Sequence, residues 1–163
     1  MGSMERAERI RANGLFAREL AKIEELEKDR IYCRHGMGHL LDVARIGRIF
    51  ILEEEADIPG DVMYAAALLH DIGRGEEYEN GTPHDEASVR IARKVLEESG
   101  YDSEEIEEIC LAIAGHRGEA DGTGSKLAQI LKKADKLSRP CYACDARDTC
   151  KWPDEKKNLS VVI

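Results

Sequence analysis

The stretch "ALLHDIGRG", residues 67–75, decides how the rest of the sequence is interpreted. It closes an almost wholly apolar run, "DVMYAAALLHDI" (residues 61–72), which follows Pro59 and Gly60. Hydrophobicity all round this run predicts a short helix buried at the centre of the protein. His70 and Asp71 stand at its end, and both residue types bind metals. Burying the two without a partner would be costly, so the sequence predicts a metal at this pair.

Helical periodicity extends over most of the chain before residue 139. It predicts helices over residues 4–28, 36–55, 61–72, 84–99, 103–115 and 125–138, whereas Gly75, Gly81 and Pro83 predict a loop over 74–83. The tail after Pro140 has no strong period. Because only 5% of residues are aromatic, packed helices are favoured over a β-sandwich. We therefore expect an all-α fold, a compact bundle of five to seven helices followed by a short Cys-containing C-terminal tail.

The composition limits the classes of partner. The chain has 163 residues, of which 42% are hydrophobic and 35% charged, as in a globular domain with a real core. A net charge of −9 disfavours broad nucleic-acid binding. It still permits a small phosphorylated substrate, because a bound metal reverses the local field. No long apolar run and no signal-peptide pattern is visible, so we expect no membrane association and a cytoplasmic localisation.

All five histidines lie near a predicted helix end or on a helix face with apolar neighbours: His35, His39, His70, His84 and His116. Asp135 lies between Leu131 and Leu137. Taken singly, most have an ordinary interpretation. His84 could simply begin a helix, Asp135 could be a solvated acid among lysines, and His116 could be either structural or a ligand. His35 could support His39 from behind, or contact the metal or the substrate itself.

Three blocks of the sequence resemble the HD-domain superfamily of metal-dependent phosphohydrolases. They are "HLLDVARIG" with His39, "AALLHDIGR" with His70 and Asp71, and "LKKADKLS" with Asp135. Their order, spacing and apolar context match over roughly residues 30–139. His84 and His116 are similar to the two further histidines of the two-metal variant. The resemblance divides the chain into an N-terminal helix (1–29), an HD domain (30–139) and the tail (140–163).

The resemblance implies a ligand set and a reaction. His39, His70, Asp71 and Asp135 would hold one divalent metal, and Asp71 would bridge to a second held by His84 and His116. The implied activity is hydrolysis of a nucleotide or other phosphate ester, as a phosphomonoesterase or phosphodiesterase, by a water that bridges the metals. Asp71 would serve catalysis, with Arg74 and Arg117 neutralising the substrate. Lys136 is a further candidate, or a surface charge. Imidazole and carboxylate ligands suit Mn, Fe, Zn, Ni or Co alike.

Two other functions stay open at this point. HD proteins similar to myo-inositol oxygenase use the same six ligand types to hold two irons and activate oxygen. A non-catalytic module that senses a metal or a nucleotide is the third interpretation. The N-terminal helix is charged and could pack on the core or on a second copy of the chain, which leaves a homodimer open.

The tail carries Cys141, Cys144 and Cys150 with the spacing C-x2-C-x5-C. Three close thiols suggest a separate metal site, with Zn or an iron–sulfur cluster, in addition to the one or two metals of the HD set. A tetrahedral site needs a fourth ligand, which Cys33 or Cys110 could supply. The alternatives are reduced thiols without a ligand, or a disulfide.

Overall fold

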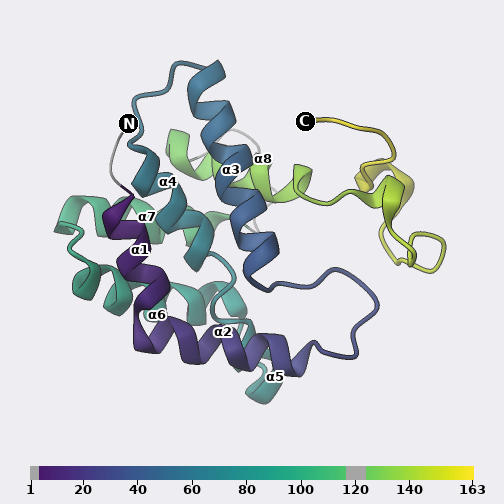
Figure 1. The fold of residues 1–163 in the computed structure, drawn as a ribbon, viewed down its shortest axis with the longest axis horizontal. Coiled ribbons are helices and arrows are strands. Elements are labelled where there is room, and N and C mark those ends of the chain that lie inside the picture. Colours follow the sequence, from purple (N-terminus) through teal and green to yellow (C-terminus); the bar gives the residue numbers. More distant parts are fainter. Residues whose placement is uncertain (1–3, 117–123) are drawn as a thin grey trace.

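The computed structural model describes residues 4–116 and 124–163. These residues form eight α-helices and two short 3-10 turns, without a strand among them, which confirms the all-α class (Figure 1). The helices are α1 (Glu5–Ala12), α2 (Gly14–Leu26), α3 (Met37–Glu53), α4 (Gly60–Leu69), α5 (Arg74–Asn80), α6 (His84–Ser99), α7 (Ser103–Gly115) and α8 (Lys126–Leu137). The turns are η1 (Cys141–Ala143) and η2 (Asp154–Lys156). None of these helices is both long enough and apolar enough to cross a membrane.

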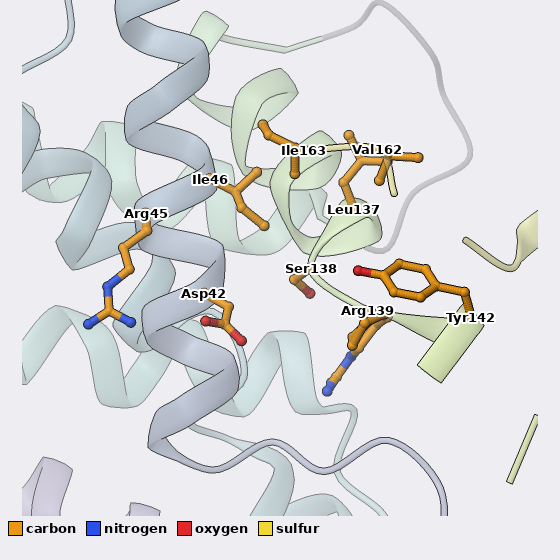
Figure 2. A pocket seen from close by; sticks show the side chains of 10 residues that line it. Asp42, Arg45, Ile46, Leu137, Ser138, Arg139, Tyr142, Val162 and Ile163 are labelled. Atoms are coloured by element: carbon orange, nitrogen blue, oxygen red, sulfur yellow. The ribbon is translucent and has the colours of Figure 1, made fainter. Parts of the chain in front are cut away.

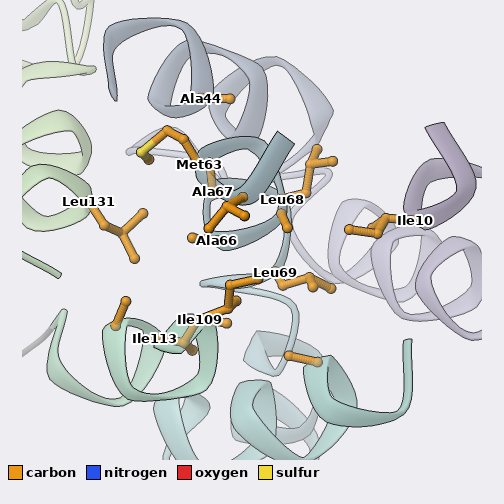
Figure 3. Close-up of a cluster of buried hydrophobic side chains, with 14 of the residues drawn as sticks. Ile10, Ala44, Met63, Ala66, Ala67, Leu68, Leu69, Ile109, Ile113 and Leu131 are labelled. Atoms are coloured by element: carbon orange, nitrogen blue, oxygen red, sulfur yellow. The ribbon is translucent and has the colours of Figure 1, made fainter. Parts of the chain in front are cut away.

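Helix α4 occupies the centre of the fold, as its apolar sequence predicts. It packs against α1, α3, α6, α7 and α8, and most of its side chains are buried. Consecutive alanines, Ala65 to Ala67, let neighbouring helices approach closely. Figure 3 shows Met63, Leu68 and Leu69 of α4 among side chains from the surrounding helices. Because α4 is fixed on several sides, the residues at its C-terminal end are held in place by the core.

The N-terminal segment forms two helices instead of the single helix expected over residues 4–28. The chain turns at Asn13, whose backbone is extended and whose side chain accepts hydrogen bonds from the N–H groups of Leu15 and Phe16. Asn13 is therefore the N-cap of α2. Because of this turn, α1 packs against α4 and α6 while α2 reaches α5.

Residues 74–80 form helix α5, where the sequence predicts a loop. This is a correction to the loop expected over 74–83. The helix is polar and has no apolar stripe that could reveal it. Ion pairs hold it to its neighbours: Glu79 lies 3.3 Å from Lys22 of α2, and Glu76 pairs with Arg90 of α6. It ends at Gly81, whose positive φ of 80° suits glycine. This helix and the turn at Asn13 bring the described helices to eight.

Helix α1 is docked on the core through Arg6. Its guanidinium donates to Asp61 of α4 at 2.7 Å and to both carboxylate oxygens of Glu105 of α7. The same group lies 4.3 Å from the ring centre of Tyr101. The N-terminal helix thus packs on its own chain.

The tail after α8 projects to one side of the helical body and folds back toward the connection between α2 and α3 (Figure 1). The Tyr32 hydroxyl lies 3.2 Å from the carbonyl of Thr149. The Asn158 side chain donates to the carbonyls of Lys136 and Arg139. The described tail contains almost no core of its own, since Ala146 is its only buried hydrophobic side chain.

Candidate metal centre

The turn after α4 presents His70 and Asp71 to the interior. His70 is fully buried, and its Nδ1 lies 2.6 Å from the carbonyl of Ala67, one turn earlier. This contact directs Nε2 away from the helix. Gly73 closes the turn by donating its N–H to the Ser88 hydroxyl at 2.8 Å. A Cβ at this position would lie 2.4 Å from the backbone nitrogen of Ser88, so only glycine allows α6 to approach this closely.

The first group of candidate ligands joins three helices. His39 comes from α3, His70 and Asp71 from the end of α4, and Asp135 from α8. Their ligand atoms all lie within 4.8 Å of one another. Asp135 Oδ1 is 3.2 Å from His39 Nε2 and 3.5 Å from His70 Nε2. Asp71 Oδ2 is 3.1 Å from His70 Nε2. Residues far apart in the sequence thus converge on one point.

The second group shares Asp71 with the first and adds His84 and His116. The other carboxylate oxygen of Asp71, Oδ1, lies 3.4 Å from His84 Nε2 and 3.7 Å from His116 Nε2. His84 opens α6, and His116 follows the last residue of α7. Each oxygen of Asp71 therefore faces a different set of imidazoles, as a bridging carboxylate would.

The polar atoms at this centre lack ordinary partners. Among the described residues, His39 Nε2, His70 Nε2 and Asp71 Oδ1 are buried and make no hydrogen bond. Leaving such atoms unpaired is expensive. Imidazole nitrogens and carboxylate oxygens at this spacing are the donor set of a divalent transition metal, which would satisfy all three. The residues present therefore fit a metal.

The electrostatics favour a cation at the same point. Burial lowers the pKa of His70, but the charges and contacts of Asp71 and Asp135 outweigh it and raise that pKa to about 10. The imidazoles in turn hold the pKa of Asp71 and that of Asp135 well below the usual range, against the effect of burial. Burial and the charge of Arg74 lower the pKa of His84, which favours the neutral ring that binds metals. A divalent cation would take the place of the proton on His70.

Several groups other than the six candidate ligands orient the ligand side chains. The second nitrogen of His39 lies 3.3 Å from the Ser138 hydroxyl, which itself donates to the carbonyl of Asp135. His84 Nδ1 contacts Glu77 of α5 at 2.7 Å, and His116 Nδ1 contacts the carbonyl of Ile113. Such contacts fix which nitrogen of each ring faces the metal. Ser138 lies at the end of the block "LKKADKLS", but nothing in the sequence indicated its role or that of Glu77.

His35 lies beside the centre but in neither ligand group. Its Nδ1 is 2.6 Å from Glu27, which also accepts from the His35 backbone N–H and the Tyr78 hydroxyl. Burial lowers the pKa of His35 to about 4, although Glu27 opposes this. Burial raises the pKa of Glu27, but the hydrogen bonds that Glu27 accepts from His35 and Tyr78 outweigh this effect and lower that pKa to about 2. His35 meets His39 edge to face, with ring centres 5.7 Å apart, and so packs behind it.

A cavity of about 650 Å³ opens directly beside the two ligand groups. Asp71, His116 and Asp135 form part of its wall, with His35 and the aromatic Tyr32 and Trp152. Six basic residues also line it: Arg30, Arg74, Lys132, Lys136, Arg139 and Lys151. Such a concentration of positive charge is unexpected in a chain of net charge −9. Arg74 and Lys136, two of the bases singled out in the sequence, are among these lining residues, whereas Arg117 lies outside the described residues.

The tail cysteines do not join the His/Asp centre. Cys141 lies in η1, Cys144 follows it, and Cys150 lines the basic cavity together with Cys33. Cys110 is buried in α7. All five cysteines have free thiols.

Four further residues line the cavity although no pattern in the sequence indicated them. They are Arg30, Tyr32, Lys151 and Trp152.

Several proteins are similar to this chain in sequence. A Clostridium beijerinckii protein described only as uncharacterized is 44% identical over 87% of this chain and 88% of its own length. The "Putative phosphohydrolase YueE" of Bacillus subtilis is 35% identical over 64% of this chain and 66% of its own. Ribonuclease Y of Acetivibrio thermocellus is 28% identical over 77% of this chain, but over only 22% of that protein.

A solved structure and a family comparison agree with these relatives. The crystal structure of a predicted HD superfamily hydrolase from an uncultured Thermotogales bacterium superposes with a TM-score of 0.63 and 25% identity. The superposition covers 88% of this chain and 81% of that one. Residues 36–139, which contain all six candidate ligands, match the HD domain. The chain therefore belongs to the HD domain family.

Proposed function

We propose that this protein is a metal-dependent phosphohydrolase that acts on a nucleotide or another phosphate ester. One observation carries the proposal: Asp71 is shared by two groups of candidate ligands, and the paired site opens onto a cavity lined by six basic side chains. The names of two relatives, a phosphohydrolase and a ribonuclease, point in the same direction. Both names concern reactions at phosphate esters.

The residues of the chain have distinct roles in this proposal. Two divalent metals, when bound, supply an activated water and neutralise the phosphate oxygens. The first group (His39, His70, Asp71 and Asp135) and the second (Asp71, His84 and His116) would hold them, with Asp71 common to both. Arg74 Nε lies 2.9 Å from Asp71 Oδ1. Arg74 thus steadies the bridging carboxylate while its guanidinium lines the cavity, where it can bind a phosphate oxygen.

The cavity favours a phosphorylated substrate over the neutral polyol of an oxygenase. Among the described residues, the side chains of Arg30, Lys136 and Lys151 have no ion-pair partner. Cations of this kind gathered in one cavity attract an anion. Tyr32 and Trp152 add aromatic surface on which a nucleobase can stack. A nucleotide uses both features, whereas a simple phosphate ester uses only the first.

The test is turnover by metal-loaded protein. Protein reconstituted with Mn, Co or Ni should hydrolyse members of a panel of nucleoside mono-, di- and triphosphates and of nitrophenyl mono- and diesters. The last two separate a phosphomonoesterase from a phosphodiesterase. Asp71→Asn should lose the activity while keeping the helical circular dichroism spectrum. Glu53→Gln, an exposed acid at the end of α3, is the matched control.

Two results would contradict the proposal. The first is protein that holds two metals per chain and is inactive on the whole panel. The second is a mixed-valent di-iron signal with turnover that requires oxygen, which would assign the centre to an oxygenase.

A further inference from the structure

The C-terminal tail and the connection between α2 and α3 bring four cysteines to one side of the molecule. Cys141 begins the η1 turn and Cys144 follows it, and the N–H of Cys144 is bonded to the carbonyl of Cys141 at 3.2 Å. Tyr32, next to Cys33, contacts Thr149, next to Cys150. Cys33 and Cys150 both line the basic cavity. Two parts of the chain that are more than a hundred residues apart in the sequence thus lie in contact at this point.

We propose that Cys33, Cys141, Cys144 and Cys150 bind a metal centre through four thiolates, as a site separate from the His/Asp centre. The spacing C-x2-C around a tight turn is typical of thiolate metal sites, and Cys33 supplies the fourth ligand that the tail lacks. Soft thiolate ligands select zinc or an iron–sulfur cluster. The proposal does not depend on the phosphohydrolase activity.

The electrostatics of the cysteines support a cation between them. Burial raises the pKa of the Cys33 thiol, Arg139 lowers it, and negative charge on Cys141, Cys144 and Cys150 raises it again. The tail thiolates therefore disfavour a thiolate at Cys33, although Arg139 compensates in part. Packing as small hydrophobic groups does not explain this gathering, since Cys144 is exposed and the other three cysteines are only partly buried. A metal turns the mutual repulsion of the thiolates into attraction.

The structure of the tail supplies an independent reason. The tail carries two short 3-10 turns and one buried hydrophobic side chain, Ala146. A segment with so small a core is usually stapled by a metal or by disulfides, and its thiols are free. On the opposite side, Val162 and Ile163 lie near Ile46 and Leu137 around a small cavity of about 140 Å³ (Figure 2). The end of the tail thus lies beside α3 and α8, whereas the Cys-containing half has a single buried hydrophobic side chain.

The sulfur atoms are too far apart for a single zinc ion to bind three of them without some movement of the chain. Among the described residues, no three cysteine sulfurs lie within 4.8 Å of one another. A zinc ion with bonds of about 2.3 Å would hold its four sulfurs about 3.8 Å apart. A cluster of several irons spaces its thiolates more widely.

The experiment measures metal and sulfide in the full chain purified without oxygen. We expect iron with acid-labile sulfide and a broad visible absorption, or, from a zinc-filled site, one zinc per chain. This metal should be lost in Cys33→Ser and in Cys144→Ser. It should remain in Cys110→Ala, which removes the fifth cysteine, and in His70→Ala, which alters only the His/Asp centre.

Thiol reactivity gives a readout that does not require the variants to fold. In the native protein, the four cysteines should resist alkylation until the metal is removed, and cobalt added to the apo-protein should give thiolate charge-transfer absorption. Four freely alkylated thiols, or a mass that reveals disulfides, would overturn the proposal. So would a metal content that is unchanged in folded Cys33→Ser protein.

Discussion

Asp71 Oδ1 lies 3.4 Å from Nε2 of His84, while the other oxygen of Asp71 faces the imidazoles of the first group. Asp71 is thus the residue that the two candidate ligand groups share, and His84 belongs to the second group alone. Substitutions of His84 and of Asp71 should therefore change the metal content by different amounts. We expect His84→Ala to reduce the metal content from two per chain to one, and Asp71→Ala to lower it further.

Elemental analysis after reconstitution measures the stoichiometry. Lys94→Ala, an exposed change on the same helix, is the control and should keep two metals. If wild-type protein binds a single metal that His84→Ala retains, His84 and His116 are structural or bind the substrate.

Chelation should destabilise the protein, because it leaves buried ligand atoms without a partner. His39 Nε2, His70 Nε2 and Asp71 Oδ1 have no hydrogen bond among the described residues. Metal at one hundred times its Kd would add about 2.7 kcal/mol per site. For a chain of this size we expect removal of one metal to lower Tm by about 5–10 °C. Thermal unfolding with and without a chelator measures this shift. In His70→Ala, the shift should be much smaller.

The sequence was sufficient to predict the elements that bear the metal centre. Helix α4 has apolar residues on every side, and the helix positions of His39 and Asp135 follow from local periodicity. These signals are local, because they depend on spacing within one segment. The HD motif then indicated that the helix positions that carry these ligands lie close together.

The remaining features depend on contacts between distant segments, which leave no local pattern. Helix α5 is stabilised by ion pairs to α2 and α6, so its own residues look like a loop. The chain turns at Asn13 because the Asn13 side chain caps α2, although the helical pattern of the sequence continues through this position. Trp152 reaches the cavity because the tail folds back on the connection before α3. None of these can be read from periodicity.

Trp152 should contribute to substrate affinity. It lines the basic cavity and is 42% exposed, so a nucleobase can stack on its ring. Stacking on an aromatic side chain contributes about 1–3 kcal/mol. Trp152→Ala should therefore raise KM for a nucleotide roughly tenfold, with little change in kcat. Tyr142→Ala is the control, since Tyr142 is a similarly exposed aromatic of the tail that lines the small cavity in Figure 2. An unchanged KM in Trp152→Ala would place the base elsewhere.

Acid should destabilise the protein through Glu27 and His35. The pKa of His35 is lowered to about 4 in the folded protein, so the unfolded chain binds more protons as the pH falls from about 6.5 toward 4. The pKa of Glu27 is lowered to about 2, so its contribution is present above about pH 4.5 and is lost below it. Glu27 supplies about 2–3 kcal/mol by this linkage.

Urea unfolding of the chelated protein between pH 7 and pH 3 measures the free energy of unfolding without the metal. Glu27→Gln should be less stable at pH 7 and should lose less stability below pH 4.5 than the wild type. Glu25→Gln, an exposed neighbour on α2, should follow the wild-type curve. Parallel curves for Glu27→Gln and the wild type would contradict the assignment.

Gly73 should be required for the distance between Asp71 and the second group. A Cβ at this position would lie 2.4 Å from the backbone nitrogen of Ser88 and 2.6 Å from the carbonyl oxygen of His84. These backbone atoms belong to the first turns of α6 and can move only if the helix moves. We therefore expect Gly73→Ala to cost about 1–3 kcal/mol of stability and to weaken binding of the second metal more than the first. Gly38→Ala is the matched change, because nothing lies within 4 Å of its Cβ and alanine favours a helix interior. It should stabilise the protein slightly and keep both metals. Denaturant unfolding with metal analysis of the two variants separates the effect of the close approach from that of an added methyl group.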